Sequence, residues 1–148
     1  MKKTHNLIIL WLIFLFSAYL SPLLAQKIQI TADWFNLDQK KAEIQAVGNV
    51  HITQNDLTIK AEKAIYNLNK KRLQVNGKIS FRYKDIFGKA GVAYYNINNK
   101  EIILEKKASI KRKKEVLKGE MIHFNLKDRK ISIKGKTNII LSLDRLKK

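Results

Sequence analysis

The chain has 148 residues, which is enough for one modest domain. It contains no Cys, so disulfides, Cys-ligated metals, a thiol nucleophile and a lipid anchor on an N-terminal Cys are all excluded. Its 30 Lys and Arg against 12 Asp and Glu give a formal net charge of +18, which predicts a polyanionic partner.

The first 25 residues have the order of a secretory signal peptide. Lys2 and Lys3 precede an apolar run from Leu7 to Leu20, and the segment ends at the small residue Ala25. The run is shorter than the roughly 20 residues of a spanning helix. We therefore predict a signal helix at 1–25 and one domain at 26–148, with an uncleaved membrane anchor as the alternative. For an exported chain, the basic charge predicts phosphorylated lipids or a membrane surface as partners, and no nucleic acid.

Beyond the leader, the sequence repeats with a period of 29 residues, in four copies. Each copy has an aromatic-centred segment: FNLDQKKAEI at Phe35, YNLNKKRLQV at Tyr66, YNINNKEIIL at Tyr95 and FNLKDRKISI at Phe124. When the four copies are aligned at this period, two columns of equivalent positions each have one exception. They are an acidic column (Asp33, Glu62, Glu120, with Gly91 as the exception) and a glycine column (Gly48, Gly77, Gly135, with Lys106 as the exception).

The second half of each copy alternates apolar and polar residues, which is the period of a half-buried strand. In the first half the apolar positions change parity, which predicts a β-bulge or sharp bend near Trp34, Lys63, Val92 and Met121. Short Asn-, Asp- and Lys-rich segments at two places per copy predict hairpins, and hence antiparallel neighbours. We expect an all-β fold of about eight strands, arranged as an open β-jelly roll or twisted antiparallel sandwich.

The inward positions of the alternating runs are the candidate ligand-binding residues. Small residues among them leave room for a tightly packed opposite sheet or for a guest such as an acyl chain, and the pattern leaves both readings open. The candidate groove residues are Ile44, Ala46, Val50, Ile52, Leu73, Val75, Ile79, Phe81, Ile102, Leu104, Ile110, Ile131, Ile133 and Ile139.

Three basic clusters lie in predicted turns, at 69–72, 111–114 and 127–130. They are either phosphate contacts at the rim of a groove or solvated turns. Trp34 and Phe35 are either a lip of the groove or a buried anchor.

The polar residues do not predict chemistry. His51 and His123 lack the further ligands of a zinc site, so we expect no metal and no cofactor. The acidic column is expected to cap loose backbone amides beside the bends. We therefore expect a binding protein and no enzyme.

Residues 28–66 resemble the OstA-like family, and in particular its LptA branch. The matching motifs are apolar–x–apolar–x–Ala–Asp at 28–33, Gly–Asn–Val at 48–50, Thr–Gln at 53–54 and apolar–x–Ala–Glu at 59–62. The later copies, GKAGVAYYNINNKEIIL and LKGEMIHFNLKDRKISIKG, follow the template more loosely. The resemblance extends over nearly all of residues 27–141.

The resemblance implies a jelly roll open along one side, whose apolar interior carries the lipid A chains of lipopolysaccharide through the periplasm of a Gram-negative envelope. It also implies related jelly-roll partners at the inner and outer membranes, an ATP-driven partner, and head-to-tail joining of protomers. The end strands KIQIT and NIILSL have the free edges that strand addition needs. Two alternatives remain: an LptC-like subunit anchored by an uncleaved N-terminal helix, and a structural β filament or adhesion module without a ligand.

Overall fold

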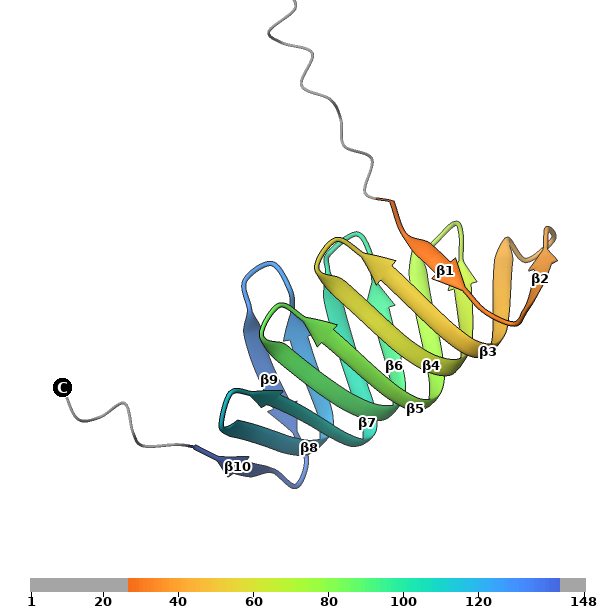
Figure 1. Ribbon diagram of the computed structural model, residues 1–148. Helices are drawn as coiled ribbons and strands as arrows, with labels where there is room; N and C mark the ends of the chain where they lie inside the picture. Colours follow the sequence, from red (N-terminus) through yellow and green to blue (C-terminus); the bar gives the residue numbers. More distant parts are fainter. Residues whose placement is uncertain (1–26, 142–148) are drawn as a thin grey trace, which may run out of the picture.

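The computed structural model describes residues 27–141, and these form one antiparallel β-sheet that is bent in two (Figure 1). The ten strands in this range are β1 (Gln29–Thr31), β2 (Trp34–Asp38), β3 (Glu43–Gln54), β4 (Leu57–Asn67), β5 (Arg72–Tyr83), β6 (Ile86–Asn96), β7 (Glu101–Arg112), β8 (Glu115–Asn125), β9 (Lys130–Lys134) and β10 (Asn138–Ile140). Within the same residues no helix is long and apolar enough to cross a membrane. The predicted signal helix lies outside the described residues.

The sheet has six long strands, β3 to β8, which pair in chain order as hairpin neighbours. Two short strands pair with the long strand at each end: β1 and β2 both pair with β3, and β9 and β10 both pair with β8. The sheet is therefore unclosed, and the predicted all-β, open antiparallel architecture is confirmed. The number of strands is larger than expected because the end copies each contribute two short strands.

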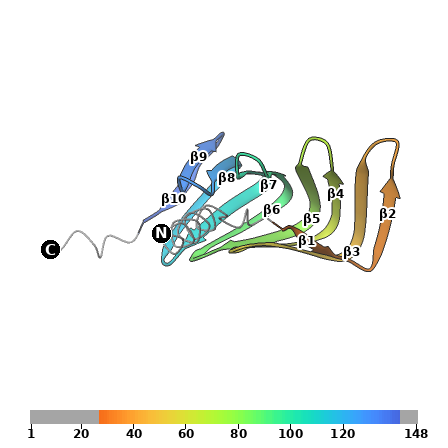
Figure 2. The same cartoon turned by 90° about the horizontal axis from the view of Figure 1, so that it is seen from above.

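Each long strand crosses a bend and so belongs to two leaves, which face each other (Figure 2). The β1 leaf contains β1, β10 and the strand halves that end at the hairpins 54–57, 83–86 and 112–115. The β2 leaf contains β2, β9 and the halves that end at the hairpins 67–72, 96–101 and 125–130. The corner is the line of bends where the two leaves join.

A β-bulge makes the corner on every pair of neighbouring long strands. The register shifts between β3 and β4 at Val47/Val50, and equivalent shifts follow in the next four pairs. The two extra residues on β3 are Gly48 and Asn49, with φ of 79° and 46°. They lie opposite one residue of β4, and this excess bends the strand. The predicted bends near Lys63, Val92 and Met121 are confirmed, and the chain also bends at Asp33, just before Trp34.

The acidic and glycine columns meet at this corner. A Cβ atom added to Gly77, whose φ is 81°, would overlap the carboxylate of Glu62, and the same holds for Gly48 with Asp33. Asp33 Oδ2 accepts a 2.8 Å hydrogen bond from Asn49 Nδ2. The corner acids were expected to cap backbone amides, whereas these contacts place them over glycines and beside neighbouring side chains.

In the last three copies the Asn of the YN or FN pair holds the hairpin that follows it, and in the first copy Asp38 does so through the amide of Lys41. Asn67 Oδ1 accepts a 2.8 Å bond from the amide of Lys70, and Asn125 Oδ1 accepts one of 2.9 Å from the amide of Lys127. Such side-chain bonds mimic a backbone turn. The preceding aromatic points to the inner face, so one dipeptide both closes the turn and fills the core.

The hydrophobic core lies between the inner faces of the leaves. Its small residues make room for large neighbours of the same chain: a Cβ atom on Gly88 would overlap the ring of Phe81, and one on Gly119 would overlap Ile133. Of the two readings that the sequence left open, these contacts correspond to close packing in this structure.

Candidate functional site

Most of the predicted groove residues line the inner faces of the two leaves. Ten of the fourteen are 3% exposed or less: Ala46, Val50, Ile52, Leu73, Val75, Ile79, Phe81, Ile102, Leu104 and Ile110. Ile44, Ile131 and Ile133 are half-buried, and Ile139 is 53% exposed. Among the described residues the apolar interior is thus closed along its middle and uncovered at its ends.

The inner apolar residues form continuous rows across the strands. One row of the β1 leaf consists of Ile30, Ile52, Ile59, Phe81, Gly88, Ile110, Leu117 and Ile139. A matching row of the β2 leaf consists of Leu37, Ile44, Tyr66, Leu73, Tyr95, Ile102, Phe124 and Ile131. Each row runs the length of the sheet, and the hydroxyls of Tyr66 and Tyr95 are the only polar side-chain groups in the two rows.

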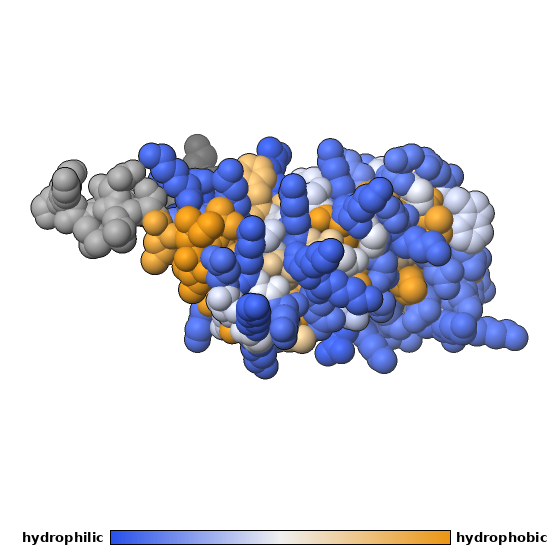
Figure 3. Space-filling view, turned by 90° about the horizontal axis from the view of Figure 1, so that it is seen from below, coloured by the Kyte–Doolittle hydropathy of each residue, from blue (hydrophilic) through white to orange (hydrophobic). Residues whose placement is uncertain are grey.

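The two rows are uncovered at opposite ends of the molecule. In the β2 leaf, Leu37 is 55% exposed, whereas Tyr95 and Phe124, at equivalent positions of later copies, are buried. In the β1 leaf the order is reversed, because Ile52 is buried and Ile139 is exposed. Figure 3 shows the resulting apolar patch, in orange, at the β10 end of the sheet.

An offset between the leaves causes this reversal. Tyr95 Oη of β6 donates a 2.6 Å hydrogen bond to Gln54 Oε1 of β3, 41 residues earlier. The ring centroids of Phe81 on β5 and Phe124 on β8 lie 6.1 Å apart. In each contact a strand of the β1 leaf is covered by the strand three places later in the β2 leaf. The last strands of the β1 leaf and the first strands of the β2 leaf therefore have no cover within the described residues.

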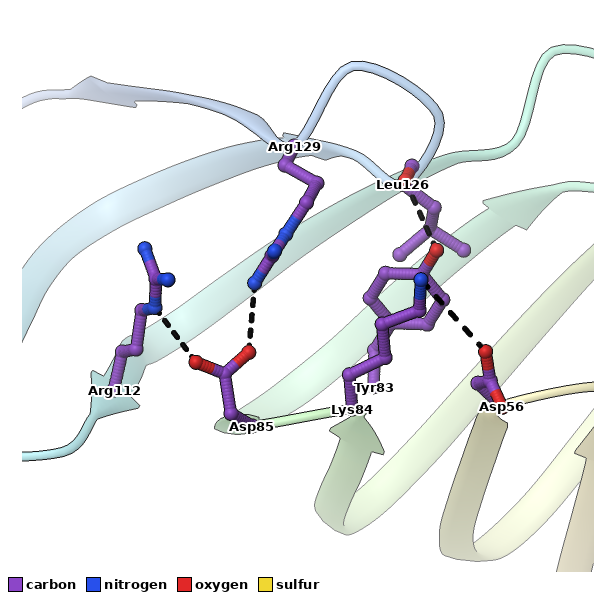
Figure 4. Close-up of polar contacts among 7 residues, drawn as sticks. All are labelled: Asp56, Tyr83, Lys84, Asp85, Arg112, Leu126 and Arg129. Carbon is purple, nitrogen blue, oxygen red and sulfur yellow. Dashed lines mark hydrogen bonds and ion pairs between the residues drawn. The ribbon is translucent and has the colours of Figure 1, made fainter.

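Opposite the corner, hairpins of the two leaves meet at a mouth, which is held by polar contacts (Figure 4). Asp85 Oδ1 accepts a 2.7 Å bond from Arg129 Nη2 of the β2 leaf, and Asp85 Oδ2 accepts a 2.8 Å bond from Arg112 Nε of its own leaf. Tyr83 Oη donates a 3.2 Å bond to the carbonyl oxygen of Leu126. We call Asp85, Arg112 and Arg129 the clasp. Its contacts join the leaves on the side where the sheet is open.

The ion pairs of the clasp favour the charged forms of their members. The side-chain bond from Arg112 is the largest cause that lowers the pKa of Asp85, and the charges of Arg112 and Arg129 act in the same direction. The same bond raises the pKa of Arg112. The ion pairs are exposed to solvent, so their contribution is modest and is screened by salt.

A buried polar contact bridges the leaves farther inside. Burial raises the pKa of Tyr95 to about 12, so its hydroxyl stays protonated and donates to Gln54. Gln54 is 5% exposed and its Nε2 has no partner. This amide nitrogen is therefore an unpaired hydrogen-bond donor on the largely apolar inner face of the β1 leaf.

The other predicted candidates lie apart from one another. His51 is on the outer face of the β1 leaf, and His123 is in the β2 leaf with its Nε2 3.2 Å from Met121 Sδ. Trp34 and Phe35 are 54% and 46% exposed, so neither is a buried anchor, and Trp34 lies on the outer face of the β2 leaf. Of the basic clusters, 111–114 and 127–130 each supply one arginine of the clasp.

The clasp was missed in the sequence because its members belong to different copies and occupy no common column. The one available signal was the type of residue. Asp85 is an acid in a predicted hairpin, and the equivalent position of the next copy is occupied by the base Lys114. The leaf offset had no sequence signal, since it depends on the twist of the whole sheet.

The comparisons with known proteins agree with this geometry. The sequence profile of the family described as "LptA/(LptD N-terminal domain) LPS transport protein" matches residues 29–130. The chain belongs to this family. No curated protein sequence matches the chain.

A solved structure gives independent support for the fold. The chain is similar to the crystal structure of LptH from Pseudomonas aeruginosa, the LptA-homologous periplasmic component of the conserved lipopolysaccharide transport device, with a TM-score of 0.73. The match covers 79% of this chain and 96% of LptH at 14% sequence identity. At that identity the match shows that the two proteins share a fold.

Proposed function

We propose that this LptA-family chain binds the acyl chains of lipopolysaccharide between its two leaves, in the periplasm, and passes them on towards the outer membrane. The observation that carries the proposal is the pair of continuous apolar inner rows, which are uncovered at opposite ends. Each methylene that moves from water into such a surface contributes roughly 0.8 kcal/mol. A lipid with several chains therefore prefers this interior to water, and its movement along equivalent positions needs no chemistry from the protein.

Because the interior is closed along its middle, uptake requires the leaves to part. The corner is continuous backbone and acts as a hinge, whereas the mouth is held by the exposed clasp and by the bond from Tyr83 to Leu126. We propose that the leaves separate at the mouth, that acyl chains replace the contacts between Phe81 and Phe124, and that the phosphates remain outside near the basic turns.

The uncovered ends support head-to-tail joining of protomers or of related jelly-roll partners. The inner face of the β1 leaf is exposed at β10. The β2-leaf strands β2 and β3 of a second copy could pack against it. The short strands at each end also leave one side unpaired for strand addition. Such joining would make the inner rows of neighbouring subunits continuous.

Photo-crosslinking tests the proposal. A photoreactive residue at Ile133 or Ile139, both on the inner faces, is expected to crosslink to lipopolysaccharide that carries labelled acyl chains. Ser132 is the matched control, since it neighbours Ile133 and points to the opposite face. Equal crosslinking from Ser132, or none from the inner positions, would contradict the carrier function and favour a filament or adhesion module.

The anchored alternative is decided by the N-terminus of the exported protein. A mature N-terminus at Gln26 would support a free periplasmic carrier. An intact N-terminus at Met1 would favour the LptC-like subunit.

A further inference from the structure

The outer faces of the two leaves differ sharply in charge. The outer face of the β1 leaf carries two cross-strand rows. One is Thr31, His51, Lys60, Ser80, Lys89, Ser109, Lys118 and Asn138, and the other is Gln29, Thr53, Thr58, Arg82, Phe87, Lys111, Val116 and Ile140. Five of these residues are basic and none is acidic.

The β2 leaf provides the contrast on the same molecule. Its central outer row consists of Asn36, Gln45, Ile65, Gln74, Tyr94, Ile103, His123 and Ser132 and contains no Asp, Glu, Lys or Arg. In the row nearer its turns, acids such as Glu43 and Glu101 accompany the basic residues. The excess of positive charge is therefore a property of one face, which general solubility would not require.

The five Lys and Arg residues of these two outer rows have no acidic partners among the described residues. Lys60, Arg82, Lys89, Lys111 and Lys118 are all exposed, and in the described part of the chain none of them forms an ion pair. Ser80 and Ser109 separate the lysines of the first row, which places successive lysines two strands apart, or about 9.6 Å. This spacing limits the repulsion between like charges, and it leaves each ammonium group free for an external anion.

An exposed aromatic side chain lies in the middle of these cations. Phe87 is 51% exposed, and its direct neighbours across the sheet are Arg82 on β5 and Lys111 on β7. Lys89, two residues along β6, points to the same side. Its counterpart on the other leaf, Tyr94, is flanked by Gln74 and Ile103. An aromatic ring surrounded by unpaired cations is typical of a surface that binds the headgroup region of an anionic membrane.

We infer that the outer face of the β1 leaf docks on the surface of an anionic phospholipid bilayer, with Phe87 among the headgroups and the five basic side chains on lipid phosphates. A nucleic acid would also offer phosphates, but binding of single strands uses several stacked aromatics in a basic groove. This face has one aromatic ring and the extended surface of a sheet. The inference concerns the outside of the protein and does not depend on lipid binding between the leaves.

The test compares two triple variants of the full chain on vesicles of phosphatidylglycerol and phosphatidylcholine. Lys60→Gln/Lys89→Gln/Lys118→Gln removes three charges from the outer face of the β1 leaf. Lys40→Gln/Lys63→Gln/Lys134→Gln removes three exposed charges from the β2 leaf and its hairpin 38–43, all outside the basic clusters. Each basic group near an anionic surface contributes about fivefold to binding, so the first variant is expected to bind about a hundredfold more weakly at low salt. The second variant should bind nearly as well as the parent, and residues 1–25 contribute equally to all three.

The depth of Phe87 supplies a second measurement. Because the chain has no Cys, Phe87→Cys and Tyr94→Cys each provide one site for an environment-sensitive dye. The dye at 87 should shift to the blue on vesicles, and the dye at 94 should not. Equal losses for the two triple variants, no shift at 87, or stronger binding to a single-stranded oligonucleotide than to the vesicles would overturn the inference. None of these outcomes would change the crosslinking expected from Ile133, so the inference and the proposed carrier function can fail separately.

Discussion

Gly91 and Lys106 face each other at the corner between β6 and β7, with glycine and side chain exchanged relative to the other three corners. A Cβ atom on Gly91 would lie 3.0 Å from Cβ of Lys106. At the corner of Glu62 and Gly77, the side chain is on the earlier strand and the glycine on the later one. The two exceptions in the repeat, Gly91 and Lys106, are therefore linked. At each of these positions along the corner there is space for only one of the two facing side chains.

A double substitution tests this relationship. Gly91→Glu alone should destabilise the fold by about 1–3 kcal/mol, because the new side chain has no space beside Lys106. Lys106→Gly removes that obstacle and also relieves a φ of 61° at a non-glycine residue. In urea denaturation the double variant should be more stable than Gly91→Glu by about 1 kcal/mol or more. Additive effects of the two changes would show that the corner is not shared.

The offset of the leaves is tested by two residues at the same position of the repeat. Ile110→Ala should lower the free energy of unfolding by about 2–5 kcal/mol, because Ile110 is 1% exposed. Ile139→Ala should change it by no more than about 0.5 kcal/mol, since Ile139 is 53% exposed. Chemical denaturation of dilute protein measures both. Similar losses would mean that the end of the β1 leaf is covered.

The hydrogen bond from Tyr95 to Gln54 should stabilise the contact between the leaves. Tyr95→Phe leaves Gln54 Oε1 unpaired in the core and should cost about 1–3 kcal/mol. Tyr94→Phe is the control, because that side chain is 38% exposed and lies on the outer face. The pKa of Tyr95 is raised to about 12 in the folded protein, so the bond also predicts a pH dependence. The stability that Tyr95 contributes is complete below about pH 10 and is lost as the pH rises towards 12. An alkaline loss of stability that Tyr95→Phe does not reduce would contradict this assignment.

The clasp predicts a loss of stability in acid. The pKa of Asp85 is lowered in the folded protein, so the stability it contributes is present above its unfolded pKa of about 3.9 and is lost as the pH falls through the folded value. Asp85→Asn should therefore lower the urea midpoint at pH 7, and the two proteins should converge as the pH falls through the folded pKa of Asp85. Asp128→Asn, in the neighbouring turn, serves as the control. A difference that does not shrink as the pH is lowered into this range would exclude the ion pairs as its cause.

Local features of this fold were predictable from the sequence, and long-range ones were not. The change of apolar parity after Ala61 is a local signal, and it correctly predicted the corner beside Lys63. Equivalence between copies, in contrast, predicted the same environment for Phe81 and Ile139, which are 3% and 53% exposed. What separates them is the offset of the leaves, which brings Phe124 over Phe81 and leaves Ile139 without a cover. That offset arises from the twist of the assembled sheet.

The close packing of the interior was not predictable from the alternation of apolar and polar residues. Small residues opposite large ones are compatible with a guest or with close packing, and Gly88 is filled by the ring of Phe81. The same alternation therefore describes both a closed sandwich and a carrier whose leaves separate.

The central claim, that lipid is taken up by parting the leaves at the mouth, is tested most directly by fixing the mouth shut. Asp85→Cys and Arg129→Cys place two thiols at contacting positions in a chain that otherwise has none. A short bismaleimide would then join the leaves, and each single-Cys variant treated with the same reagent is the control. The measurement is the amount of labelled lipopolysaccharide bound to the purified protein. We predict that the joined protein loses this binding while both controls retain it; full binding by the joined protein would contradict the account.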